Sequence, residues 1–75
     1  MRIEINNYIV SDPEICGGTP TFKGTRVMVW QVLELLGVGV SIEEIMKDYF
    51  PHLSRESILS VFHFTSKLIS EEYAR

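Results

Sequence analysis

The sequence predicts a mostly α-helical domain that begins with a small β-hairpin and continues with three helices, the last two forming a helix-turn-helix. Three observations support this prediction. Strand-forming residues flank a turn at Lys23-Gly24. An almost wholly apolar stretch follows from Met28 to Leu36. Two helix-start signals then stand on either side of Pro51.

The N-terminal part carries short strand signals. Tyr8-Ile9-Val10 is an aromatic and β-branched run with turn residues after it, so we predict a strand there. We place the hairpin arms at Thr19–Phe22 and Thr25–Met28, with Gly24 supplying the positive φ of the turn. Pro20 has no N–H, so its arm is an edge strand or begins just after it.

The first predicted helix runs from Val29 to Leu36, with Gly37 as a candidate left-handed C-cap. Its polar residues, Gln31 and Glu34, share one narrow strip. A helix that is apolar over most of its circumference is buried on more than one side, and a chain of 75 residues can hardly cover it. We therefore expect Trp30 to be largely buried. We also expect a homodimer that buries parts of this helix or the hairpin edge.

The second and third helices are predicted from their first residues. Ser41 and Glu44 fit a capping box, and Pro51 stops the second helix. The third helix starts at Ser54 and extends toward Arg75. The apolar stripe expected for the second helix is Ile42, Ile45, Met46, Tyr49 and Phe50. The main stripe expected for the third is Ile58, Phe62, Thr65, Leu68, Ile69 and Tyr73, with Val61 and Phe64 as a second apolar flank.

The connection between these helices has the length found in DNA-reading helix-turn-helix motifs, in which the start of the second helix enters the major groove. The candidate DNA-binding residues are therefore Ser54, Arg55, Ser57, Ser60 and His63, with Lys23 and Arg26 near the hairpin turn as phosphate contacts. The alternatives are a plain helical corner and solvated charges at the turn. They stay open because the helix lacks the basic cluster of DNA-binding domains.

Composition indicates a single domain over residues 1–75, with the strand and hairpin in 1–28 and the three-helix unit in 29–75. Seven basic and ten acidic residues give a net charge of −3, which argues against tight DNA binding by a monomer. Cys16 is the single cysteine, which fits a reducing cytoplasm. No apolar run reaches the roughly 18 residues of a membrane span, and we see no signal-peptide core. We expect a cytoplasmic protein that does not bind membranes.

No residues meet the requirements of a catalytic or metal site. We see no nucleophile beside a base, and Gly17-Gly18 does not lead into the Gly-Lys-Ser/Thr of a phosphate loop. His52 and His63 lack the partners that would complete a four-ligand zinc site. We therefore predict no enzyme, no metal and no cofactor.

The order of several short motifs resembles a known family, the bacterial domain-of-unknown-function family 433. These motifs are Asp12–Ile15, Gly17–Pro20, Phe22–Val27, Gly39–Glu44 and Asp48–Leu53. The hairpin motif is the most specific part and comprises Gly18, Pro20, Lys23, Gly24, Thr25 and Arg26. The resemblance implies a homeodomain-like or winged helical fold, and a role as antitoxin beside a PIN-like ribonuclease toxin. Thr21 stands where the family more often has an aliphatic residue.

Together these observations favour a small bacterial regulatory module that binds promoter DNA, as the antitoxin of a type II toxin–antitoxin pair. The alternative is a protein-interaction or dimerisation module that does not contact DNA. A small nuclease-like reading frame next to the gene would favour the antitoxin.

Overall fold

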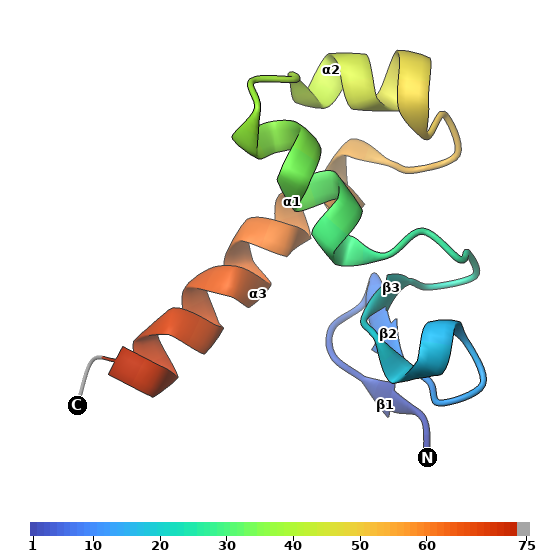
Figure 1. Cartoon of the computed structure of the whole chain (residues 1–75), viewed down its shortest axis with the longest axis vertical. Coiled ribbons are helices and arrows are strands. Elements are labelled where there is room, and N and C mark those ends of the chain that lie inside the picture. Colours follow the sequence, from blue (N-terminus) through green and yellow to red (C-terminus); the bar gives the residue numbers. More distant parts are fainter. Residues whose placement is uncertain (74–75) are drawn as a thin grey trace.

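The computed structural model describes the backbone of residues 1–73 and the side chains of residues 1–72. A small antiparallel sheet has the strand order β1-β2-β3, with β1 at Ile3–Glu4, β2 at Ile9–Ser11 and β3 at Thr21–Phe22. The helices are α1 (Val29–Gly37), α2 (Ile42–Glu44), its continuation η2 (Ile45–Tyr49) and α3 (Arg55–Tyr73), and a short turn, η1, spans Cys16–Gly18. Figure 1 shows α1 crossing between α2 above it and the sheet below it. The predicted class, mostly α with a small N-terminal β element and three helices, is confirmed.

The predicted hairpin is present only as a tight turn. Its second arm, Thr25–Met28, contributes one isolated bridge to Thr21 and is not a strand. Its first arm pairs instead with β2, through Phe22 opposite Ile9. The chain enters α1 directly after the bridge, which leaves no room for a second arm. Gly24 has a φ of 79° at the turn, as predicted.

The hydrophobic core lies where the sheet meets the inner faces of the helices. Its fully buried side chains include Ile9, Phe22, Val32, Ile45, Ile58 and Val61. On α3 the buried face is centred on Ser57, Ile58 and Val61. Phe62 lies one residue beyond that face, about 100° around the helix from Val61, and is exposed. Its assignment to the core was therefore wrong.

Trp30 is also exposed, against the prediction that it is largely buried. Helix α1 buries Val29 and Val32 and packs Leu33 partly against the core. Trp30 lies about 100° around the helix from Val29, off that face. Its indole N–H instead lies 3.3 Å from the Met28 sulfur. Because α1 is apolar almost all round, the spacing of its apolar residues did not indicate which side faces the core.

The left-handed residue that closes α1 lies two positions later than predicted. Gly39, and not Gly37, adopts the positive φ, at 95°. The N–H of Gly39 donates to the carbonyl of Leu36 at 3.1 Å, and the N–H of Val40 donates to the carbonyl of Leu35 at 3.0 Å. This pair of bonds is the Schellman motif, which requires a left-handed residue at Gly39.

The capping box that starts α2 is confirmed. The Glu44 N–H donates to the Ser41 hydroxyl at 3.1 Å, and the Glu44 carboxylate accepts from the Ser41 N–H at 3.1 Å. The helix then widens into the π-helical turn η2, where the Phe50 N–H donates to the Ile45 carbonyl at 2.7 Å. A π turn uses more residues per turn than an α-helix, so Tyr49 rotates away from the predicted stripe and is exposed.

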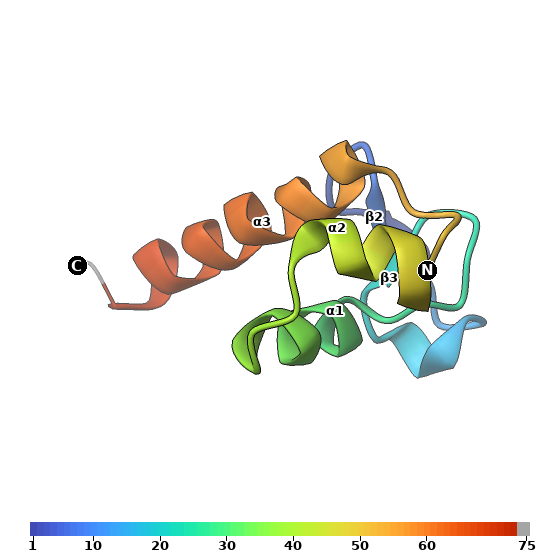
Figure 2. The same cartoon turned by 90° about the horizontal axis from the view of Figure 1, so that it is seen from above.

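Helix α3 is the longest element, and its second half leaves the rest of the molecule. It stands clear of the sheet, α1 and α2 in both views (Figures 1 and 2). Residues 66–72 are all exposed, including Leu68 and Ile69, which were wrongly expected in the core. The Tyr73 side chain and Arg75 lie outside the described residues. Within residues 1–73 no helix is long and apolar enough to cross a membrane.

Candidate functional site

The three predicted DNA-contacting serines lie on the first turns of α3, and their hydroxyls bond to the helix itself. The Ser54 hydroxyl accepts the Ser57 N–H at 3.1 Å. The hydroxyl of Ser57, which is buried, donates to the Ser54 carbonyl at 2.7 Å, and the Ser60 hydroxyl donates to the Ser57 carbonyl at 2.7 Å. These bonds stabilise the start of α3 and use the hydroxyl hydrogens of Ser57 and Ser60, whereas the exposed Ser54 hydroxyl keeps its own hydrogen for another acceptor.

Two of the predicted cationic contacts are held in exposed ion pairs. Arg55 donates to the Glu43 carboxylate, and the Lys23 ammonium lies 2.5 Å from a Glu4 carboxylate oxygen. The hydrogen bond from Lys23 is the main cause that lowers the pKa of Glu4. The pKa of Glu43 is lowered first by its own backbone N–H and then by Arg55. Solvent-exposed ion pairs contribute little to stability, so a phosphate could displace either carboxylate at low cost.

The structure brings part of the predicted set together. Lys23 from the hairpin turn lines the same shallow hollow as Ser54 and Ser57 from the start of α3, with a volume of about 280 Å³. Arg26 is exposed, and its side chain has no ion pair or hydrogen bond within residues 1–72. His63 lies two helical turns beyond Arg55 and lines a different pocket.

A second surface is an apolar groove between α1 and α3, with a volume of about 250 Å³. Its lining residues are Thr19, Pro20, Val29, Trp30, Leu33, Phe64, Thr65 and Leu68. Trp30 comes from α1 and Leu68 from α3, and both are about half exposed, at 52% and 48%. The sequence analysis missed this groove because it assigned both residues to the core. Large apolar side chains that stay half exposed in a concave site are typical of binding surfaces.

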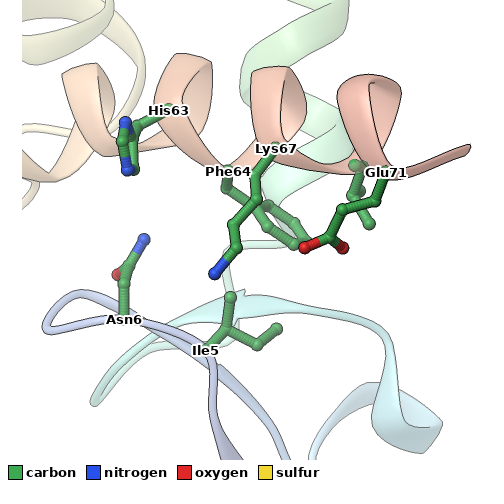
Figure 3. A pocket seen from close by; sticks show the side chains of 7 residues that line it. Ile5, Asn6, His63, Phe64, Lys67 and Glu71 are labelled. Carbon is green, nitrogen blue, oxygen red and sulfur yellow. The ribbon is translucent and has the colours of Figure 1, made fainter. Parts of the chain in front are cut away.

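A polar pocket of about 350 Å³ adjoins the groove, since Phe64 and Leu68 line both. In Figure 3 the Asn6 amide nitrogen and the Lys67 ammonium point into this pocket, with His63 beside them. The Asn6 side-chain oxygen already accepts two backbone N–H groups, at 2.7 and 2.9 Å, so its amide donors remain for the pocket. The groove therefore ends beside hydrogen-bond donors, the positive charge of Lys67 and the negative charge of Glu71, which lines the same pocket.

The described residues offer no metal site. Among residues 1–72 there is no group of three or more His, Cys, Asp or Glu side chains that could hold a metal ion. The groove offers apolar surface, and the pocket beside it offers hydrogen-bond donors and the charges of Lys67 and Glu71.

The structure is a small, mostly α-helical domain with an N-terminal antiparallel sheet and an apolar groove between α1 and α3. The chain belongs to the family described as "Protein of unknown function (DUF433)", whose family model matches residues 9–65. It is also similar to "Uncharacterized protein y4eO" of Sinorhizobium fredii (strain NBRC 101917 / NGR234), with 42% identity over 50 residues. That match covers 67% of this chain and 22% of the relative, so the chain spans about a fifth of that protein. No solved structure matches the chain significantly.

Proposed function

We propose that this chain is a protein-binding regulatory module of the antitoxin type, which captures a partner protein in the groove between α1 and α3. The observation that carries this proposal is the half exposure of Trp30 and Leu68 on one apolar groove. The resemblance to an antitoxin-like family supports a ribonuclease of the PIN-like kind as the partner.

The groove has the composition of an interface centre. Full burial of a large apolar side chain is worth about 1.5–3 kcal/mol, so the exposed halves of Trp30 and Leu68 together account for about 1.5–3 kcal/mol. Tryptophan is among the residues that most often dominate binding energy when a partner desolvates it. A partner segment with two or three apolar anchors fits this surface.

The adjoining polar pocket indicates the charge of that segment. Lys67 supplies a positive charge, and Asn6 and His63 supply hydrogen-bonding groups at the end of the groove. A carboxylate on the partner accepts hydrogen bonds from Lys67 and Asn6, although the Glu71 carboxylate lines the same pocket and offsets part of the Lys67 charge. We therefore expect an apolar segment that carries an acidic side chain at the end nearest Lys67.

The test is a binding titration between this protein and a PIN-like ribonuclease from the same organism. Trp30→Ala and Leu68→Ser should each weaken binding by about tenfold or more, which corresponds to about 1.4 kcal/mol. Val38→Ala is the matched control, because Val38 is an exposed aliphatic residue outside the groove. Circular dichroism checks that each variant stays folded. Unchanged affinity in both groove variants would contradict the proposal.

DNA binding is a second candidate, and one observation favours it. Lys23, Ser54 and Ser57 line one hollow at the start of α3, where a homeodomain-like helix-turn-helix meets DNA. Since the net charge is −3, binding should be weak and sensitive to salt. In a titration of labelled promoter DNA, Arg55→Ala should lose about 1–3 kcal/mol on the specific site, and Lys23→Ala should flatten the salt slope by about one. No binding at low salt would exclude this candidate.

A further inference from the structure

The side of α3 away from the groove carries a second apolar surface, which we call the α3 seam. It comprises Leu59, Phe62, Ser66 and Ile69. These residues follow one another at intervals of three, four and three, which places them on one side of a helix as in a coiled coil. Leu59, Phe62 and Ile69 are 43%, 46% and 56% exposed. The groove residues of α3, Phe64, Thr65 and Leu68, are centred about 130° around the helix from the seam, so the two surfaces are distinct and meet only at Thr65.

The second half of the seam has no cover within the chain. Residues 66–72 are all exposed, and this part of α3 stands free in Figures 1 and 2. The radius of gyration, 12.5 Å, exceeds the value of about 11 Å expected for a compact domain of this length. A helical segment with few tertiary contacts is only marginally stable in water, so a partner surface that covers this segment stabilises the helix.

We propose that this cover is the α3 of a second copy of this chain, packed antiparallel about a two-fold axis near residue 64. Helix α3 runs from residue 55 to residue 73, so an axis at its midpoint overlaps the two helices along their full length. The exposed second half of each helix then lies beside the first half of the other. This goes beyond the proposed function, because the groove stays open in the dimer.

The residues of the seam fit this register. An axis at residue 64 places Phe62 opposite the partner's Ser66, and Leu59 opposite the partner's Ile69. Each large aromatic ring thus meets a small hydroxymethyl group, and the aliphatic residues meet each other. A parallel pair would instead set Phe62 against the partner's Phe62 and leave a gap between the two serines.

The charges at the two ends of α3 also favour the antiparallel pair. Arg55 and Glu56 lie in the first turn of α3, whereas Glu71 and Glu72 lie near its end. The antiparallel pair sets the partner's acidic end beside Arg55 and Glu56, whose charges cancel, whereas a parallel pair places the two acidic ends side by side. It also sets the two helix dipoles in opposite directions.

The size of this interface indicates a weak dimer. A helix of 19 residues is about 28 Å long, and two such faces bury on the order of 1,000 Å² in total. That value is at the lower limit for a specific interface. We therefore expect association in the micromolar range, strengthened by moderate salt because each chain carries a net charge of −3.

Analytical ultracentrifugation of the whole chain tests the interface. The wild type should approach twice the chain mass of 8.6 kDa at concentrations of about 100 μM. Ile69→Lys should raise the dissociation constant at least tenfold. Val38→Lys is the matched control, because Val38 is 76% exposed and lies outside the seam. Phe62→Ser should weaken the dimer, and the exchange Phe62→Ser with Ser66→Phe should restore it.

Distances between spin labels test the orientation. The labelled variants carry Cys16→Ser, so that each chain has one labelled cysteine. In the antiparallel dimer, labels at Glu56→Cys should be about 25 Å apart and labels at His63→Cys about 10 Å apart. These distances follow because α-helices rise about 1.5 Å per residue and pack about 8–10 Å apart. A parallel pair gives short distances at both sites. The proposal would be overturned if the wild type is monomeric or if both label pairs are close together. It would also be overturned if Val38→Lys dissociates the dimer as strongly as Ile69→Lys.

Discussion

Replacing Thr21 by valine should stabilise the domain. Thr21 lies in β3 with 0% of its surface exposed, and its hydroxyl oxygen has no hydrogen-bond partner among the described residues. A buried hydroxyl that loses water without gaining a partner costs about 1–3 kcal/mol. Valine has almost the same shape and suits a strand equally well, so the change removes this cost without leaving a cavity.

We expect the free energy of unfolding of Thr21→Val to rise by about 1–2 kcal/mol, because some of the cost is relieved by small movements of the hydroxyl. For a domain of this size, that rise corresponds to an increase in Tm of about 4 °C or more. Urea denaturation followed by circular dichroism measures the first quantity, and a thermal melt measures the second. An aliphatic residue at this position also agrees with the family pattern.

Thr25→Val is the matched control, because it makes the same chemical change where the hydroxyl is used. The Thr25 hydroxyl donates to the Phe22 carbonyl at 2.8 Å and accepts the Val27 N–H at 3.0 Å. Its loss leaves both backbone groups without this partner and should lower the free energy of unfolding by about 1–2 kcal/mol. A decrease in stability for Thr21→Val as well would refute the reasoning, since it would mean that the Thr21 hydroxyl is satisfied.

Three further substitutions test other parts of the structure. Trp30→Ala should lower the free energy of unfolding by only about 1 kcal/mol, because Trp30 is half exposed, and a thermal melt measures this change. A loss of about 3–5 kcal/mol would mean that Trp30 lies in the core. Lys23→Met should raise the pKa of Glu4 toward 4.5 in an NMR titration. A carboxyl group with a lowered pKa adds stability above pH 4.5, and this stability is lost as the pH falls. The Lys23→Met variant should therefore lose less stability than the wild type when the pH falls below 4.5. An unchanged Glu4 pKa would mean that the ion pair is absent in solution. Gly39→Ala should lower the free energy of unfolding by about 1 kcal/mol or more, because Gly39 has a positive φ. Gly37→Ala should raise it by up to about 1 kcal/mol, because Gly37 is within the helix. Equal effects in urea denaturation would contradict the assignment of Gly39 as the left-handed residue of the cap.

Local features were predictable where their cause lies within a few residues. The capping box needs only Ser41 and Glu44, three positions apart, and both of its hydrogen bonds form. The turn at Gly24 needs a residue that tolerates positive φ, and glycine does so without cost. The order of the helices follows from such signals, which is why the class of fold was correct.

The orientation of the helices was harder to predict. Helices α1 and α3 are apolar on more than one side, so the spacing of their apolar residues allowed several core faces. The predicted faces were displaced by about one residue, which put Trp30 and Phe62 in the core. The π turn was not expected either, and it moved Tyr49 to the surface.

The candidate sites depended on contacts between distant residues. Glu43 is 12 positions from Arg55, and Glu4 is 19 positions from Lys23, so neither ion pair was visible in the sequence. The groove requires α1 and α3 to be side by side, which depends on the whole fold. One signal did point to it: the chain has more apolar helix surface than a core of this size covers, and this excess was the reason for expecting a dimer.

The excess apolar surface lies on two sides of one helix, and this arrangement links the proposals. A dimer through the α3 seam leaves both grooves free, so one assembly presents two equivalent sites for a partner protein. It also places the two starts of α3 about 28 Å apart along the helix axis, since the helices overlap over 19 residues. The lateral offset of about 8–10 Å between the two helices makes the direct separation of these starts about 30 Å, slightly less than the distance of about 34 Å between successive major grooves on one face of DNA. The same dimer therefore presents the Lys23 and Arg55 regions of two chains at its opposite ends, so that each end can meet DNA separately.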